Sequence, residues 1–514
     1  MHTHRGLRFH WLPVAGRFLL LTAVFALTYT QSPLYTSNQN QYFLHGLARA
    51  GYGSLAQDWL ANTLDPTPVF TFIVEWTYRV LHCKEIFYAY YALLMGVYLF
   101  SLLGIVEQVF PLRRSPTLFL AYLAGLFLVH SAGLRFALSR ALGENWTYVL
   151  EDGVADQRLL GPVFQPSTFG VLLLLSIYLF LQRRAIWAVL CAVLAATLHP
   201  TYLLSAAALT FTYMLLTYWE ERRFEKPVWL GGAALLAVAP VVAYVYLNFG
   251  STPPGTTAQA QHILIDFRIP HHARVDWWFD ATAVFKLGLV LAALWRVRKQ
   301  RLLGVLAPPF AVAVTLTVVQ VLTGSATLAL LFPWRMSTWL APLATALLLA
   351  WLITELAQRL GSRLAPYRGW AQAASLGLIA LTVLVGGVRL RLDFARQAAA
   401  PERLLLAYVA QHKAPGEVYL IPTKMQDFRL VSGAPAYVEF KSIPYRDADV
   451  LEWYRRIQLS ERVYKREDCG ALASLAEEGV TQVVLPAESQ AAACPALREV
   501  YADGQYGLYR LDTP

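Results

Sequence analysis

The sequence predicts a mostly α-helical, polytopic membrane protein with about eleven transmembrane helices and a C-terminal extracytoplasmic α/β domain. Of its 514 residues, 57% are hydrophobic, whereas a soluble domain has roughly 45–50% apolar residues. The excess lies in runs of roughly 17–25 residues, the length of a helix that spans a bilayer. After about residue 390 the long runs stop, and short alternating segments typical of helices and strands follow.

Eleven apolar runs are predicted to span the membrane. The first lacks the small-residue cleavage site of a secretory signal, so we expect it to be retained. The runs are residues 17–33, 85–109, 116–135, 166–182, 185–199, 200–219, 228–248, 282–297, 302–323, 333–354 and 370–388.

The basic residues predict the orientation of these spans. Seventeen Lys and Arg lie in six short segments, the first of which contains Arg5, Arg8 and Arg17, while only seven lie in the four alternate loops. By the positive-inside bias, the six segments and the N-terminus are cytoplasmic and the C-terminal domain is extracytoplasmic. The expected location is the inner or plasma membrane. This placement also accounts for the net charge of +10 without a nucleic-acid partner.

We expect two domains. Residues 1–389 form the transmembrane domain, whose first outer loop, 34–84, carries surface helices, and residues 390–514 form the soluble domain. In the soluble domain, helices are expected at 404–412, 447–459, 471–478 and 491–501, and strands at 417–421, 436–441, 481–485 and 506–511. Cys469 and Cys494 lie there, and we favour two free thiols over a disulfide, which an oxidising compartment permits.

Polar residues gather at the outer ends of the predicted spans. Charged groups beside hydrocarbon are costly, so their default interpretation is functional. Arg335 is suited to bind a phosphate. The alternative interpretation is that its side chain snorkels to the lipid head groups. The histidines are equally compatible with a structural role, either at a helix end with their hydrogen bonds satisfied or in a surface loop. The candidates for substrate or carrier binding in these regions are His199, Arg268, His271, His272 and Arg335.

The first outer loop holds the remaining candidates. Asn38, Asn40 and His45 can hydrogen-bond a sugar or its carrier. Asp58 and Asp65 are candidate catalytic bases, although Asp65 can also cap the helix that starts at Pro66.

Other acids and a metal are considered as alternatives. Glu144 and Asp152 are further candidate bases. No metal site is assigned because no ligand spacing is evident, and the cofactor is unknown, with a divalent metal left open.

The order of motifs in the first loop carries a resemblance. A polar motif follows the first span, then come Gly51-x-Gly53, Asp58-Trp59-Leu60 and Pro66-x-Pro68, and then the second span. This order resembles the first outer loop of GT-C glycosyltransferases, such as protein O-mannosyltransferases and the lipid A aminoarabinose transferase. The resemblance implies transfer of a sugar from a polyprenyl-phosphate carrier at the outer membrane face, with a lipid-linked donor and membrane lipids as partners. The overall layout matches along the chain, and residues 35–80 carry the detail.

One position departs from that class. The family places an acid a few residues beyond the first span, where this chain has Asn38-Gln39-Asn40. An amide cannot take a proton at neutral pH. Two functions therefore stay open. One is a glycosyltransferase with Arg335 and Arg268 as its phosphate clamp, and the other is a non-catalytic protein of this fold that binds a lipid or glycan or scaffolds a membrane complex.

Overall fold

The computed structural model describes residues 14–250 and 252–512. The chain forms two compact units that alternate along the sequence. Unit 1 comprises Met1–Gln31, Tyr88–Val241 and Ile269–Arg391, and unit 2 comprises Ser32–Phe87, Val242–Arg268 and Leu392–Pro514. The predicted division into two domains at residues 389 and 390 stays a prediction. Arg5 and Arg8, used above for the orientation, lie outside the described residues.

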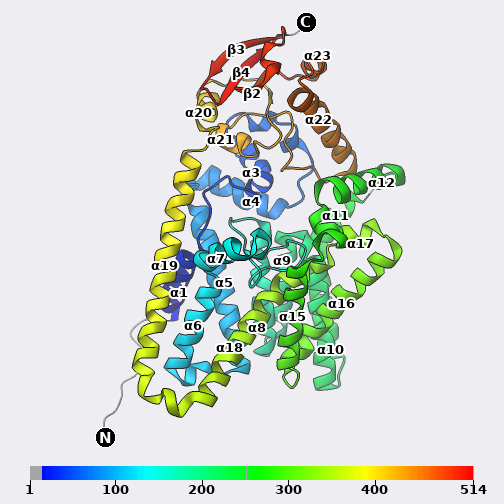
Figure 1. Cartoon of the computed structure of the whole chain (residues 1–514). Coiled ribbons are helices and arrows are strands. Elements are labelled where there is room, and N and C mark those ends of the chain that lie inside the picture. Colours follow the sequence, from blue (N-terminus) through cyan, green and yellow to red (C-terminus); the bar gives the residue numbers. More distant parts are fainter. Residues whose placement is uncertain (1–13, 251, 513–514) are drawn as a thin grey trace. The chain divides into compact units, whose positions relative to one another are not determined.

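Unit 1 is helical, and α5, α11 and α19 continue from it into unit 2. Within it, α8 packs against α9, α10 against α9 and α16, and α18 against α6 and α15. Its helices, labelled in part in Figure 1, are α1 (Val14–Tyr29), α5 (Ile86–Val109), α6 (Pro116–Val129), α7 (Ala132–Leu142), α8 (Val171–Leu181), α9 (Ala185–Leu198), α10 (Leu203–Glu221), α11 (Glu225–Phe249), α13 (Pro270–Ala273), α14 (Val275–Trp278), α15 (Ala281–Arg296), α16 (Arg301–Thr323), α17 (Ala326–Leu330), α18 (Ser337–Leu364) and α19 (Arg368–Ala398), with short turns η4 (Leu112–Arg114), η5 (Glu144–Trp146), η6 (Pro166–Gly170), η7 (Pro200–Tyr202), η9 (Pro333–Met336) and η10 (Ala365–Tyr367).

Ten of the eleven predicted spans coincide largely with one helical stretch of the structure, and the eleventh, 116–135, crosses the break between α6 and α7. In the described part of the chain, six helical stretches are long and apolar enough to cross a membrane: Ile86–Val109, Pro200–Glu221, Glu225–Phe249, Arg301–Thr323, Ala326–Gly361 and Ala365–Ala398. The pair α6 and α7, bent by 53°, makes a seventh if it is one span, and α1, Pro166–Leu181 and α9 are shorter apolar helices. The chain is a multi-pass helical membrane protein, as predicted.

Unit 2 combines the first loop with the C-terminal segment. In α4, Phe70 and Val74 are buried, while the equally apolar Phe72 and Trp76 are exposed, so one face packs within unit 2 and the other leaves an apolar surface. Its helices are α2 (Gln39–Tyr42), α3 (Leu44–Arg49), η1 (Leu55–Gln57), η2 (Leu60–Asn62), α4 (Pro68–Trp76), the π-helical η3 (Thr77–Leu81), α12 (Pro254–His262), the π-helical η8 (Ile263–Arg268), α20 (Arg403–His412), α21 (Phe428–Ser432), α22 (Asp447–Arg466), α23 (Gly470–Glu477) and η11 (Gln490–Ala493).

A four-stranded sheet of order β1-β2-β4-β3 anchors the C-terminal segment (Figure 1). The strands are β1 (Tyr419–Leu420), β2 (Gln482–Pro486), β3 (Leu497–Ala502) and β4 (Tyr506–Leu511), and only β1 and β2 are parallel. Successive side chains of β2 point to opposite faces. Val483 and Leu485 pack in the core that contains α22 and α23, and Val484 packs in the core that contains α20 and α21. Burial on both faces explains the continuous apolar run of β2.

Three predictions for this segment were wrong. Residues 491–501 do not form a helix, because Pro495 keeps Cys494 extended and the chain then pairs as β3 with β4. Residues 436–441 do not form a strand beyond one bridge from Ala436 to Tyr419, because the Glu439 carboxylate accepts the N–H groups of Lys441 and Ser442 and turns the chain. Cys469 and Cys494 form a disulfide instead of remaining free.

Candidate functional site

A polar cluster in unit 1 is built around residues 151–158, here called the acidic loop. The loop turns at Ala155 and Asp156, whose φ angles are +58° and +49°. The left-handed conformation costs a residue with a side chain roughly 1–2 kcal/mol. Such strain persists where surrounding contacts fix the backbone, and it is concentrated at functional sites.

Asp152 is the carboxyl group at the centre of this cluster. Its Oδ2 lies 2.9 Å from Nε of Arg158, and the nearby Lys286 ammonium donates to the carbonyl of Gly153 at 2.8 Å. The side chain is nearly buried, and its Oδ1 accepts no hydrogen bond from the described residues. Burial raises the pKa of Asp152 to about 7, although the positive charges of Arg158 and Lys286 lower it. A carboxyl group with this pKa can hold or release a proton at neutral pH, as acid–base catalysis requires.

The other two acids of the loop are also paired. Arg158 reaches Asp156 at 3.0 Å, and Glu151 pairs with Arg135 of α7 at 3.1 Å. Both arginines also lie against the ring of Tyr148, at 4.0 and 5.3 Å from its centroid. These contacts hold the acidic loop from two sides and fix the position of Asp152.

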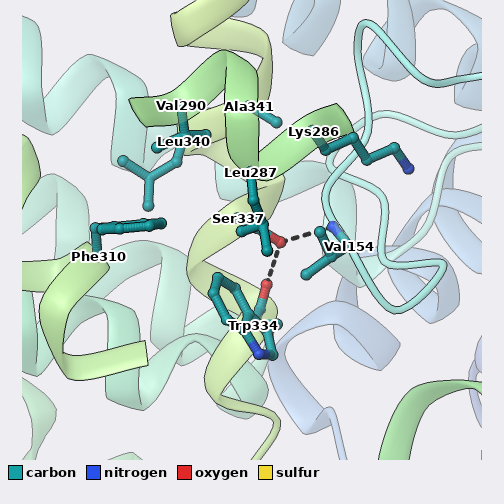
Figure 2. A pocket seen from close by; sticks show the side chains of 9 residues that line it. All are labelled: Val154, Lys286, Leu287, Val290, Phe310, Trp334, Ser337, Leu340 and Ala341. Atoms are coloured by element: carbon teal, nitrogen blue, oxygen red, sulfur yellow. Dashed lines mark hydrogen bonds between the residues drawn. The ribbon is translucent and has the colours of Figure 1, made fainter. Parts of the chain in front are cut away.

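Ser337, at the start of α18, ties the acidic loop to the segment that carries Arg335. Its Oγ accepts the N–H of Val154 at 2.9 Å and donates to the carbonyl of Trp334 at 2.5 Å (Figure 2). A Cβ on Gly153 would lie 2.8 Å from the N of Thr338, so this close approach requires glycine. The loop and the start of α18 therefore form one fixed structure within unit 1.

Arg335 binds to the break between two helices. Pro200 ends the helical course of α9 and α10 at His199, whose backbone is extended. Arg335 donates to Nε2 of His199 at 2.7 Å and to Oγ1 of Thr201 at 3.1 Å. Because a guanidinium only donates, Nε2 of His199 must accept, and the ring is neutral with its proton on Nδ1. No carboxylate of the described residues pairs with Arg335, which leaves its charge available to an anion.

His271 and His272 join Arg335 to the acidic loop. Nδ1 of His272 donates to the carbonyl of Ala155 at 2.6 Å, and the two histidine rings lie 4.1 Å apart. Burial, with smaller contributions from the nearby His271 and Arg335, lowers the pKa of His272 to about 3. At neutral pH the ring of His272 is therefore uncharged. The predicted residues His199, His271, His272 and Arg335 thus gather around the acidic loop.

Asp58 lies in unit 2 and is completely buried. Its Oδ1 accepts the N–H groups of Leu60 and Ala61, at 2.9 and 3.2 Å. Its Oδ2 accepts Nε of Arg429 at 2.6 Å and the N–H of Ala436 at 2.9 Å. Four hydrogen bonds occupy the carboxylate, so this geometry favours a structural role over proton transfer.

Only one carboxylate oxygen of Asp65 accepts a hydrogen bond from the described residues. Its Oδ1 accepts the N–H of Thr67 at 2.9 Å, which is the capping contact expected from the sequence. Its Oδ2 lies 3.1 Å from a nitrogen of Arg49, yet without the geometry of a hydrogen bond. Nearby, His45 contacts the carbonyl of Thr63 at 3.2 Å. Burial lowers the pKa of His45, and the negative charge of Asp65 opposes this effect.

The remaining predicted residues also lie in unit 2. Asn38 precedes α2 without capping it, and Asn40 is buried with both side-chain polar atoms unpartnered. Arg268 donates to the carbonyl of Lys441 at 2.5 Å and lies 5.1 Å from the ring centroid of Phe440. Burial lowers the pKa of Arg268.

Sequence reasoning left out three cations of the site. Lys286 interrupts an apolar run within a predicted span, a position where an ionisable side chain is a functional candidate by default. That signal was sufficient to find it. Arg135 ends the predicted span 116–135 and gave the same signal, whereas Arg158 lies in a loop, and its role depends on how the loop after α7 folds.

The described residues contain no group of three or more His, Cys, Asp or Glu side chains placed to hold a metal ion. The cations of the cluster are all side chains of the chain itself: Arg135, Arg158, Lys286 and Arg335.

Comparisons with known proteins address the chain as a whole. A domain of unknown function, DUF6798, matches residues 400–460, and no curated protein matches the chain. The chain is similar to ArnT from Cupriavidus metallidurans bound to undecaprenyl phosphate, with 12% identity and a TM-score of 0.49 over 98% of this chain and 100% of that one. It is also similar to the apo state of that protein, with 14% identity and a TM-score of 0.39 over 97% and 99% of the two chains.

Proposed function

We propose that this chain is a membrane glycosyltransferase that takes a sugar from a polyprenyl-phosphate donor, with Asp152 as the general base. The observation that carries the proposal is the Asp152 carboxyl group, which lies buried between Arg158 and Lys286 with a pKa raised by burial to about 7. A base of this pKa is matched to neutral pH. The polyprenyl-phosphate donor is proposed from the resemblance of the first loop to that of GT-C glycosyltransferases.

The chemical step follows from the charges of the cluster. An acceptor hydroxyl oxygen attacks the anomeric carbon of the sugar and transfers its proton to Oδ1 of Asp152. The bond between that carbon and the phosphate oxygen breaks, and its electron pair stays on the departing polyprenyl phosphate. Arg335, which has no carboxylate partner among the described residues, stabilises the negative charge that develops there. His199 and Thr201 fix the plane of its guanidinium for this contact.

The other predicted residues keep their proposed roles. His271 and His272 border the donor site from the side of Ala155. In unit 2, taken by itself, Asn38, Asn40, His45 and Arg268 are proposed contacts for a sugar or carrier, and the amide of Asn40, which has no partner among the described residues, is the one best suited to a sugar hydroxyl. Asp65 is the second candidate base.

A non-catalytic function is the alternative. It is favoured by Asn38-Gln39-Asn40 in place of the expected acid and by the occupied carboxylate of Asp58. The tight packing beside Lys286 and Val154 (Figure 2) also favours a non-catalytic function, because the hollow there has no room for a water molecule. On this alternative the protein binds a lipid or glycan, or scaffolds a membrane complex, without transferring a sugar.

The proposed orientation places the N-terminus in the cytoplasm and the segment after residue 391 outside it. The disulfide between Cys469 and Cys494 supports this side, because such bonds persist in oxidising compartments. Reporter fusions after Pro514 and in the connection between α15 and α16 are expected to report opposite compartments. The same compartment for both contradicts the orientation.

The function is tested with the full chain in proteoliposomes and a panel of undecaprenyl-phosphate-linked hexoses and pentoses. Asp152→Asn is expected to lower the transfer rate by about 10²–10⁴ while undecaprenyl phosphate still binds. Arg335→Gln is expected to weaken that binding at least about tenfold, because hydrogen bonds to charged groups are strong. Asp276→Asn and Arg274→Gln, which alter an exposed ion pair, serve as matched controls.

Two outcomes separate the alternatives. Transfer by Asp152→Asn at the wild-type rate moves the base elsewhere, with Asp65→Asn as the next variant. Binding of undecaprenyl phosphate by the wild type without transfer from any donor establishes the non-catalytic function.

A further inference from the structure

A second polar cavity in unit 1 lies among residues that the proposed site does not use. It has a volume of about 230 Å³, which is room for roughly seven water molecules. Its wall comes from the end of α5 with the turn that follows, the end of α15 with Gln300, and one face of α18. The lining residues are Val109, Phe110, Pro111, Arg296, Gln300, Thr354, Glu355 and Gln358.

Arg296 is the cation of this cavity. Its guanidinium lies 5.8 Å from the ring centroids of both Phe110 and Trp351. It forms no hydrogen bond or ion pair with the described residues, so its donors face the cavity or solvent. Two weak cation–π contacts hold the charge in place without neutralising it. Such an arginine is suited to bind a phosphate.

Glu355 supplies the opposite charge on the same wall. Its Oε1 accepts Nε of Arg359 at 2.7 Å, which leaves Oε2 for another cation. Gln300, Thr354 and Gln358 add amide and hydroxyl groups to the lining of the cavity. A ligand that fills the cavity therefore needs an anionic and a cationic group a short distance apart.

The surroundings indicate a lipid as the source of that ligand. The cavity lies where apolar helices end, beside the aromatic rings of Phe110 and Trp351, which is the composition of a membrane–water interface. The basic residues Arg298, Lys299 and Arg301 follow directly after Arg296. Basic pockets between transmembrane helices bind lipid head groups.

We propose that this cavity binds the head group of a zwitterionic phospholipid with a primary amine, of the phosphatidylethanolamine class. Its phosphate contacts Arg296 and its ammonium contacts Glu355. The lipid belongs to the leaflet on the side of the basic connections. The inference uses none of the residues of the proposed transfer site, and it stands whether or not the chain transfers a sugar.

The test is lipid binding to the detergent-purified full chain, measured by native mass spectrometry with phosphatidylethanolamine, phosphatidylglycerol and phosphatidylcholine. Phosphatidylethanolamine is expected to bind most tightly. Arg296→Gln is expected to lower its affinity at least about tenfold, which is the loss of one charge-assisted hydrogen bond. Glu355→Gln is expected to weaken phosphatidylethanolamine without weakening phosphatidylglycerol, because only the first carries the ammonium. Glycerophosphoethanolamine, the head group without its chains, is expected to bind more weakly than the lipid.

Two further variants keep the test decisive. Arg298→Gln removes a neighbouring exposed arginine that rests on Trp295 and does not line the cavity, so binding is expected to be unchanged. Gln358→Trp fills the cavity with all charges intact and is expected to abolish the preference for phosphatidylethanolamine. Equal losses from Arg296→Gln and Arg298→Gln would show only a general attraction to basic residues and overturn the proposal. So would wild-type binding by Arg296→Gln, or three lipids bound equally by the wild type.

Discussion

Replacing Asp58 is expected to destabilise unit 2 and to leave the chemistry of transfer unaffected. The carboxylate is completely buried and accepts four hydrogen bonds, one of them from the buried guanidinium of Arg429 at 2.6 Å. Removing one partner of a buried ion pair costs about 3–5 kcal/mol, because the other charge loses its closest partner, and here only Glu439, 3.6 Å from Arg429, remains. A unit of 150–250 residues loses roughly 2–4 °C in its unfolding midpoint per kcal/mol, so Asp58→Ala is expected to lower the midpoint by roughly 6–20 °C.

Asp58→Asn sharpens this prediction. The amide oxygen can still accept the N–H groups of Leu60 and Ala61. Its nitrogen, however, then faces two donors, Nε of Arg429 and the N–H of Ala436. We therefore expect a large loss of stability although the shape of the side chain is kept. Replacing both partners with apolar residues, as in Asp58→Leu with Arg429→Met, is expected to recover much of it.

The assay is thermal unfolding of the detergent-purified chain, followed by tryptophan fluorescence. Trp59 is one of the 15 tryptophans that contribute to this signal; it packs against the core of α22 and lies 4.2 Å from the guanidinium of Arg456. Sugar transfer is measured on the same samples well below the midpoint. If the Asp58→Asn protein unfolds at the wild-type midpoint but transfers no sugar, the reasoning is refuted. Asp58 then takes part in the transfer reaction itself.

Three further predictions concern the acidic loop and the disulfide. Gly153→Ala brings a Cβ to 2.8 Å from the backbone of α18 and is expected to displace the loop and lower transfer at least about tenfold, whereas Gly232→Ala, with open space around it, leaves transfer unchanged. Transfer is expected to rise as the pH passes upward through about 7, because Asp152 accepts a proton only once ionised, and a profile without this limb contradicts its role. Reducing the bond between Cys469 and Cys494, 25 residues apart, is expected to cost about 3–4 kcal/mol, seen as a lower unfolding midpoint.

The membrane part of the fold could be predicted because its signal is local. Each apolar run can be recognised from its own residues, without knowledge of the helices against which it packs. The break at His199 could also be predicted, because Pro200 disfavours a helical conformation in the residue before it. Residues 491–501 could not, because an alanine-rich start resembles a helix and the pairing of β3 with β4 depends on a turn further along the chain.

The candidate site was predicted in part. His199 and Arg335 were proposed from their positions at the ends of apolar runs and His272 from the loop between the runs 228–248 and 282–297, and all three lie in unit 1. The pairing of Asp58 with Arg429 could not be found, because 371 residues separate them. The raised pKa of Asp152 depends on burial that arises only when the acidic loop folds against α18.

The division of unit 2 into three segments has a consequence for how the protein is made. Asp58 is translated early, but its partners Arg429 and Ala436 leave the ribosome only after every span has been synthesised. Until then the first loop lacks the partners of Asp58, and a chain stalled before Leu392 offers none. The same dependence limits the use of fragments. A soluble piece excised from Leu392 onward would contain Arg429 with Glu439, 3.6 Å away, but not Asp58, which lies 2.6 Å from it, and is expected to be a poor substitute for that segment of the intact protein.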